Sequence, residues 1–188
     1  FFEKAVEIDP AFASAFLWLA HAHHYLNNLR ERDEALKRAH ALSQKATERE
    51  RLLIEAEYAG YIIKDAEEHL RLLKEAAEKY PKDKEFQYWI GRYYLDRAMY
   101  ELASEAYAKA LSLDPDYPEA LNNGAYALAG LKQYELDIVH LKRYASLLPG
   151  IFNPLDSLAE MYFRMGRLDE AIEHYGKAVS INLDSHQS

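Results

Sequence analysis

The side chains best suited to chemistry in this 188-residue chain are histidines and carboxylates with short spacings. His21 and His24 lie three residues apart, and so do Asp137 and His140. Residues at this spacing share one face of a helix, where such a pair can ligate a metal ion. Zinc sites generally need three or four protein ligands, and carboxylate-bridged metal sites need the three-residue element twice. Neither pair meets that requirement, so we expect no metal site and no cofactor.

Other catalytic signatures are missing from the sequence. It contains no Gly-rich phosphate loop, no G-x-S-x-G elbow and no H-E-x-x-H helix. Cysteine is absent as well, which removes disulfides, thiol nucleophiles and thiolate metal ligands. We therefore predict that the chain is not an enzyme.

The charge and hydropathy of the chain narrow the range of partners. The formal net charge of −8 disfavours a nucleic acid, because binding one requires neutralisation of phosphates. No apolar run approaches the roughly 18 residues that a bilayer-spanning helix needs, so no membrane span is expected. The compartment is unknown from sequence, and the cytoplasm is taken as the default.

Composition and proline spacing predict the elements that position these side chains. Ala and Leu far outnumber Val, Ile and Thr, which favours helices over strands. Pro81, Pro115 and Pro149 recur with a 34-residue period, and each interval has room for two amphipathic helices and a turn. Helix starts are predicted at a capping box formed by Thr47 and Glu50, at Asp116, and at the Asn153-Pro154 pair.

Small and aromatic residues recur at the same positions within these 34-residue intervals. One interval holds Gly91, Tyr94, Ala103, Tyr107, Ala110 and Pro115, and the last holds Leu158, Ala159, Tyr162, Ala171, Tyr175 and Ala178. This pattern resembles the tetratricopeptide repeat family, most fully over residues 84–117 and 152–183. The resemblance implies an all-α fold, a right-handed α-solenoid of stacked antiparallel helix hairpins with 34-residue repeats.

The repeat register divides residues 1–188 into a single array. Residues 1–12 are expected to be the second helix of a truncated repeat, followed by hairpins at 13–49, 50–83, 84–117, 118–151 and 152–185. Asp137 and Tyr144 stand where the family prefers alanine, so local changes in packing are expected there. Gly60 and His69 are departures from the family pattern in residues 50–83. Three extra residues in the first hairpin are predicted to lie in the turn from Asn27 to Asp33. Further helices are expected in the natural chain, both upstream and downstream.

The resemblance also implies a binding surface, because first helices line a concave groove in this family. The residues it places in that groove are His21, His24, Tyr58, Tyr61, Tyr88, Arg92, Asn122, Tyr126 and Glu160. About half of the tyrosines are expected to serve mainly in packing. Asp156 and Glu160 make one end of the groove acidic, which favours a basic segment of a partner.

The function that fits best is a non-catalytic scaffold that binds a peptide or protein partner in this groove. One alternative is a regulatory or sensor arm of a larger bacterial signalling or transcription protein. Another is a self-assembly module, in which a homodimer forms through the apolar side of the C-terminal helix. No contact with nucleic acid is expected.

Overall fold

The computed structural model describes residues 1–185, with side chains up to residue 181. Helices make up nearly all of this part of the chain, and it contains no strand. The predicted all-α fold is therefore confirmed. The chain divides into two compact units, unit 1 comprising Phe1–Pro81 and unit 2 beginning at Lys82.

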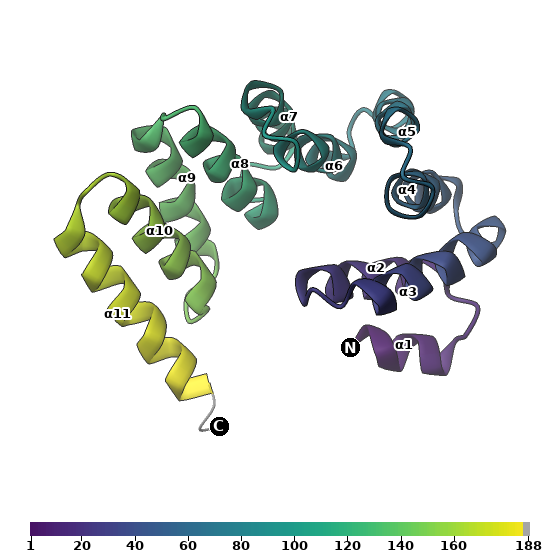
Figure 1. Ribbon diagram of the computed structural model, residues 1–188, viewed down its shortest axis with the longest axis horizontal. Helices are drawn as coiled ribbons and strands as arrows, with labels where there is room; N and C mark the ends of the chain where they lie inside the picture. The colour runs from purple at the N-terminus through teal and green to yellow at the C-terminus, as the bar shows by residue number, and fades with distance from the viewer. Residues whose placement is uncertain (186–188) are drawn as a thin grey trace. The chain divides into compact units, whose positions relative to one another are not determined.

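Unit 1 is built from one single helix and two hairpins. Its helices are α1 (Phe2–Ile8), α2 (Ala13–Tyr25), α3 (Leu29–Leu42), α4 (Glu48–Tyr58) and α5 (Ala66–Lys79). A 3₁₀ turn, Ser43–Lys45, follows α3, and a π-helical turn, Ala59–Ile63, extends α4. The two hairpins pair α2 with α3 and α4 with α5, while α1 packs against α2 and α3 packs against α4 (Figure 1).

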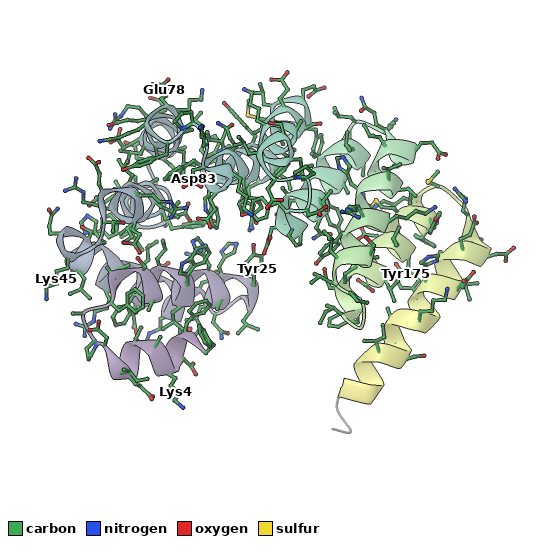
Figure 2. The ribbon with its side chains drawn as sticks, turned by 180° about the vertical axis from the view of Figure 1, so that it is seen from behind. Lys4, Tyr25, Lys45, Glu78, Asp83 and Tyr175 are labelled. Carbon is green, nitrogen blue, oxygen red and sulfur yellow. The ribbon has the colours of Figure 1, made fainter. Side chains whose placement is uncertain are left out.

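Unit 2 contains three hairpins. Its helices are α6 (Lys84–Leu95), α7 (Tyr100–Leu113), α8 (Pro118–Gly130), α9 (Tyr134–Leu147), α10 (Phe152–Arg164) and α11 (Leu168–Ser185). Each helix pairs with its successor, and α7 packs on α8 as α9 packs on α10 (Figure 1). Side chains fill the spaces between these helices (Figure 2). Both units are thus stacks of antiparallel hairpins, as the 34-residue pattern predicts.

A residue with left-handed backbone conformation closes the turn within every hairpin. These residues are Asn27, Lys64, Ala98, Lys132 and Gly166, with φ between 54° and 74°. The last four recur with the same period as the prolines. Only one of the five is glycine, although glycine adopts this conformation at the least cost. The backbone conformation therefore repeats at these turn positions even though the residue type does not.

The three extra residues do not lie in the turn between α2 and α3, so that prediction is wrong. This turn spans residues 26–28 and is as short as the turns at 131–133 and 165–167. One extra residue lies in the connection from α3 to α4, where the 3₁₀ turn forms. The other two lie between the start of α4 and Lys64, a stretch that is longer by two than its equivalent in the other hairpins. The π-helical turn absorbs them, because its wider winding holds more residues per turn.

One of the three predicted helix starts has the expected cap. Thr47 accepts a hydrogen bond from the backbone of Glu50, whose side chain in turn accepts one from the backbone of Thr47. Asp116 does not cap α8, which begins with Pro118 after Tyr117, because its carboxylate instead pairs with Arg143. Asn153 lies inside α10 and accepts a hydrogen bond from Tyr144, so it does not cap the helix either.

The two helices of a hairpin meet at a pair of positions that the turn residue defines. Seven residues before it, on the first helix, stand Ala20, Glu57, Gly91, Ala125 and Ala159. Five residues after it, on the second helix, stand Arg32, His69, Ala103, Asp137 and Ala171. Small residues at these positions let helices approach closely. The α6/α7 and α10/α11 hairpins follow this rule, while the other three place a polar side chain in the contact.

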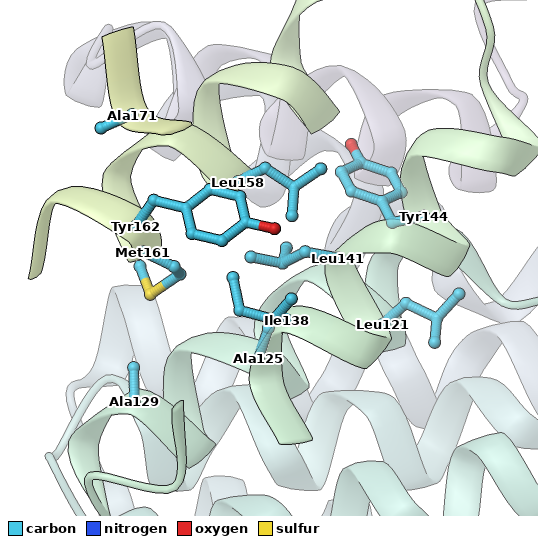
Figure 3. Close-up of a cluster of buried hydrophobic side chains, with 10 residues drawn as sticks. All are labelled: Leu121, Ala125, Ala129, Ile138, Leu141, Tyr144, Leu158, Met161, Tyr162 and Ala171. Atoms are coloured by element: carbon cyan, nitrogen blue, oxygen red, sulfur yellow. The ribbon is translucent and has the colours of Figure 1, made fainter. Parts of the chain in front are cut away.

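The core of unit 2 shows how the hairpins join. Leu121 and Ala125 of α8, Ile138 and Leu141 of α9, and Leu158 of α10 belong to one buried apolar cluster (Figure 3). Met161, Tyr162 and Ala171 continue it toward α11. Burial of this apolar surface holds successive hairpins together and fixes the direction in which their first helices point.

Candidate functional site

The first helices of unit 2 are joined by hydrogen bonds between polar side chains. Asn123 on α8 donates to the hydroxyl of Tyr88 on α6 at 3.0 Å. Ser157 on α10 donates to Oδ1 of Asn122 at 3.1 Å, and Tyr126 donates to Oε2 of Glu160 at 3.0 Å. We call the surface formed by Tyr88, Asn122, Tyr126, Asp156 and Glu160 the first-helix face of unit 2. It brings together four of the residues predicted to line a groove.

The electrostatics of this face are dominated by carboxylates. Glu160 pairs with Arg164 one turn further along α10, at 3.0 Å from Nε. Asp156 is exposed and has no ion-pair partner among the described residues. Burial raises the pKa of the Tyr126 hydroxyl to about 12, and the charges of Glu160 and Asp156 add to the increase. Tyr126 therefore remains a hydrogen-bond donor at every physiological pH.

The predicted residues of unit 2 differ in how far they are enclosed. Tyr88 is buried, with only 3% of its surface exposed, and its ring packs near Trp89, Tyr107 and Tyr117. Arg92 is half-buried and forms an ion pair with Asp96 at 3.1 Å. The amide N–H groups of Asn122 have no partner among the described residues, so they can bond a peptide carbonyl.

In unit 1, one of the predicted histidines and a histidine of α5 lie close to a buried carboxylate. Glu57, on α4, has 2% of its surface exposed. Its Oε1 is 3.1 Å from Nε2 of His69 on α5, and its Oε2 is 3.9 Å from Nε2 of His21 on α2. Gly60 allows this approach, since a Cβ at that position would lie 2.3 Å from Nδ1 of His69. In the α4/α5 contact, Glu57 and His69 therefore stand at the positions that usually hold small residues.

His24 and Tyr61 complete this cluster from the side of α2 and the π-helical turn. The His24 ring lies 5.4 Å from the Tyr61 ring, and the Arg32 guanidinium lies 4.7 Å above the Tyr61 ring. Together with His21 and Glu57 they surround a cavity of about 10 Å³, the space of one water molecule. The ninth predicted residue, Tyr58, stacks on His40 of α3 with centroids 3.8 Å apart, which is a packing contact between hairpins.

Asp137 on α9 is a second buried carboxylate, and its surroundings differ. It is fully buried, and neither of its oxygens has a hydrogen-bond partner among the described residues. Burial raises the pKa of Asp137 to about 7, while Arg164 opposes the increase and Glu160 reinforces it. The charges of Arg164 and Glu160 thus act on the pKa of Asp137 in opposite directions.

The sequence did not indicate a cleft of about 360 Å³ in unit 2, lined by α7, α8 and α9. Its lining includes Tyr107, Leu111, Leu128, Leu136 and His140. Burial lowers the pKa of His140, so its imidazole is neutral at physiological pH. The mainly apolar lining suits an apolar group better than a charged one.

Two general properties of the described residues bear on function. Among residues 1–185, no helix combines the length and apolar character that a bilayer-spanning segment needs. Within the same range, no three histidine or carboxylate side chains are placed to hold one metal ion. The i, i+3 pairs of the sequence therefore gain no third ligand from the described part of the fold.

Comparison with known families identifies the repeat. Models of the tetratricopeptide repeat match residues 85–117 and 153–185, the two stretches in which the motif is fullest. These two stretches therefore match tetratricopeptide repeats. Its first-helix face and its polar hairpin contacts are therefore variations on a known repeat.

Part of the chain is also similar to a curated protein that carries this repeat. Over 83 residues the chain is 32% identical to small glutamine-rich tetratricopeptide repeat-containing protein 2 of Mycosarcoma maydis. The match covers 44% of this chain and 24% of the relative, so the chain spans about a quarter of that protein.

Solved structures of tetratricopeptide repeat proteins share the fold. A thermophilic TPR protein of Thermus thermophilus is 21% identical with a TM-score of 0.71, covering 89% of this chain and 90% of its own. MamA is 18% identical with a TM-score of 0.67, covering 90% and 98%. YrrB, described as a TPR protein with an unusual peptide-binding site, is 17% identical with a TM-score of 0.63, covering 97% and 93%. At these identities the likeness concerns the fold.

Proposed function

We propose that this protein is a non-catalytic interaction scaffold whose first-helix face of unit 2 binds a peptide segment carrying a basic side chain. The observation that supports it most directly is the exposed carboxylate of Asp156, which has no partner within the described residues and lies one helical turn from Glu160. A lysine or arginine side chain complements two carboxylates, and the Tyr126 ring offers a rigid apolar surface for its methylene groups.

The backbone of such a segment has a partner as well. The amide N–H groups of Asn122 lie on the same face and have no partner in the described part of the chain. An asparagine side chain can hold an extended peptide in register by bonding a main-chain carbonyl. His21, His24, Tyr58 and Tyr61 remain predicted binding residues of unit 1, and Arg92 remains one of unit 2.

Fluorescence anisotropy with two labelled peptides of identical length tests the proposal. One peptide carries two arginines in an alanine-glycine background, and the other carries two glutamates at the same places. We expect the arginine peptide to bind, and Asp156→Asn to weaken it about two- to fivefold, the range for exposed ion pairs. The matched control is Glu105→Gln on the second helix α7, an exposed residue, which should leave binding unchanged. Equal binding of both peptides would reject the assignment of a basic partner.

Self-association is a second candidate, favoured by the exposed apolar side chains of α11. Ile172 and Val179 are 70% and 58% exposed, and Tyr175 is labelled on the same helix in Figure 2. The spacing of these three residues along α11 places them on one side of the helix. A second copy of the chain, packed antiparallel on this helix, would bury all three. Sedimentation velocity should then show a dimer that Ile172→Lys dissociates, whereas Glu173→Lys leaves this apolar side unchanged. A monomer at high concentration in the unaltered protein excludes this interface.

A further inference from the structure

The ionisable group that the proposed binding function leaves unexplained is Asp137. Its carboxyl group is completely buried at the contact of α8 and α9, where the repeat usually has alanine. A buried polar group without a hydrogen bond is costly, and a buried unpaired charge costs more. Since both oxygens of Asp137 lack a hydrogen-bond partner within the described residues, the neutral acid is the less costly form.

The charges that act on Asp137 come from one neighbouring helix. Among the described residues, the main contacts of α9 are with α8 and α10. From α10, Arg164 favours the carboxylate and Glu160 disfavours it. The charged residue of α8 is Glu119, which lies in its first turn and acts on Tyr144 instead. On α9 itself, the imidazole of residue 140 is neutral because burial lowers its pKa, and the other charged side chains are exposed.

Arg164 and Glu160 connect this buried group to the surface. Glu160 accepts hydrogen bonds from Arg164 and from Tyr126, and both Tyr126 and Glu160 belong to the first-helix face. A ligand that brings positive charge to Glu160 therefore also changes the electric field at Asp137. The carboxyl group responds to that field by a change of protonation, because no hydrogen bond from the described residues stabilises either form.

We propose that Asp137 is a proton-linked regulator of the first-helix face: a cationic side chain that binds beside Glu160 drives the proton off Asp137. The O–H bond of the carboxylic acid breaks, the proton passes to solvent, and the carboxylate remains. This inference rests on the proposed binding of a basic partner. By linkage, affinity for that partner rises with pH from about 6 to 8, by up to about tenfold if binding moves the titration midpoint by one unit.

The coupling is tested first without any ligand. Carbon-13 NMR of the side-chain carboxyls follows the titration of Asp137 in the whole chain, with Asp137→Asn to assign the resonance. Glu160→Gln should lower the midpoint and Arg164→Gln should raise it, whereas Glu105→Gln should not move it. Midpoints that stay unchanged in both the Glu160 and the Arg164 variants would overturn the coupling.

Calorimetry then tests the link to binding, with N-acetylated tetra-arginine amide as the probe. Titrations at pH 7 in phosphate and in Tris, which differ in ionisation enthalpy, give the number of protons released. We expect about 0.3 to 0.5 proton per bound peptide, the amount expected for a group near its midpoint. Asp137→Asn should bind the probe and release none of these protons.

The outcomes separate the two proposals. Binding with equal proton release in the Asp137→Asn variant contradicts the role of Asp137 and leaves the binding face intact. No binding of the probe contradicts the proposed function, and the NMR midpoints alone then decide whether Asp137 is coupled to Arg164 and Glu160.

Discussion

The α4/α5 hairpin and the α8/α9 hairpin both bury a carboxylate where the repeat normally has a small residue. Glu57 of the first lies within 3.1 Å of His69 and 3.9 Å of His21. Asp137 of the second is fully buried and has no hydrogen-bond partner among the described residues. The acid of the first hairpin therefore has an imidazole of its own hairpin and one of α2 beside it, whereas the acid of the second has no hydrogen-bond partner among the described residues. The contrast shows that the contribution of a buried carboxylate to stability depends on the groups beside it as well as on its burial.

The change in stability should have opposite sign in the two hairpins when the carboxylate is removed. Breaking a buried pair leaves a desolvated partner, whereas removing an unpaired buried acid takes away a penalty. The two hairpins thus provide an internal comparison within one chain.

The largest effect is expected from Glu57→Ala. It leaves His69 and His21 without their shared carboxylate and opens a cavity, so we expect a loss of about 3 to 5 kcal/mol in the free energy of unfolding. Urea denaturation at pH 7 measures it. In the double variant with His69→Ala, the loss should be smaller than the sum of the two single losses. Strictly additive losses would mean that the two residues do not act as a pair.

A stabilising effect of comparable size is expected from Asp137→Asn at high pH. The pKa of about 7 in the folded state lies above the unfolded value, so folding favours the protonated acid. Stability of the natural protein should fall as pH rises from about 4 to 7 and stay level above that. At pH 8 the asparagine variant should gain about 2 to 4 kcal/mol, and at pH 4 almost nothing. Denaturation curves at these two pH values suffice, and equal gains at both would contradict the assignment.

Gly60→Ala should be the next largest change. The added Cβ would meet the His69 ring at 2.3 Å. The imidazole must therefore leave Glu57, at a cost of about 1 to 3 kcal/mol. Truncation of the ring by His69→Ala should abolish most of this cost, and a loss that persists without the ring would point to another cause.

Gly176→Ala on α11 is the matched control for the glycine at the π-helical turn. Nothing lies within 4 Å of the methyl group that this substitution adds. The control should therefore gain up to about 1 kcal/mol through helix propensity. Urea denaturation of both alanine variants gives the comparison, and a loss at Gly176 would mean that the methyl group itself disturbs this helix.

The smallest effect should be the same in both hairpins. Lys64 and Lys132 both hold left-handed backbone conformations with exposed side chains, so Lys64→Gly and Lys132→Gly should each stabilise by about 0.5 to 1 kcal/mol. Lys142→Gly, an exposed site within α9, should instead lose about 1 kcal/mol. Thermal denaturation monitored by circular dichroism compares the three. A difference between the two turns would show that the π-helical turn before Lys64 alters its strain.

Repeat length, hairpin pairing and the Thr47 capping box were predictable because each depends on residues near one another in sequence. Prolines, small residues and a local side-chain pattern carry that information. The π-helical turn was not predictable, since Gly60 and the extra residues do not by themselves indicate where the helix widens. The cap expected at Asp116 failed for a tertiary reason, because Arg143 of a different helix takes its carboxylate.

The sequence predicted which residues belong to the candidate site better than it predicted the contacts that each of them makes. The repeat register placed Asn122, Tyr126 and Glu160 on the first helices of neighbouring hairpins. In the structure Asn122 accepts a hydrogen bond from Ser157, and Tyr126 donates one to Glu160. Asp137 was noted as a departure from alanine, but its lack of a partner depends on three helices at once. Glu57 was missed, although its place seven residues before the left-handed turn residue could have signalled it once that turn was known.

The packing of each helix against its immediate successors has a consequence for the speed and order of folding. In both units the main helix contacts join elements adjacent along the chain, so that folding does not wait for distant segments to meet. Chains whose contacts are this local fold on microsecond to millisecond timescales. During synthesis, a helical pair can close as soon as its second member has left the ribosome, and it then serves as a template for the pair that follows.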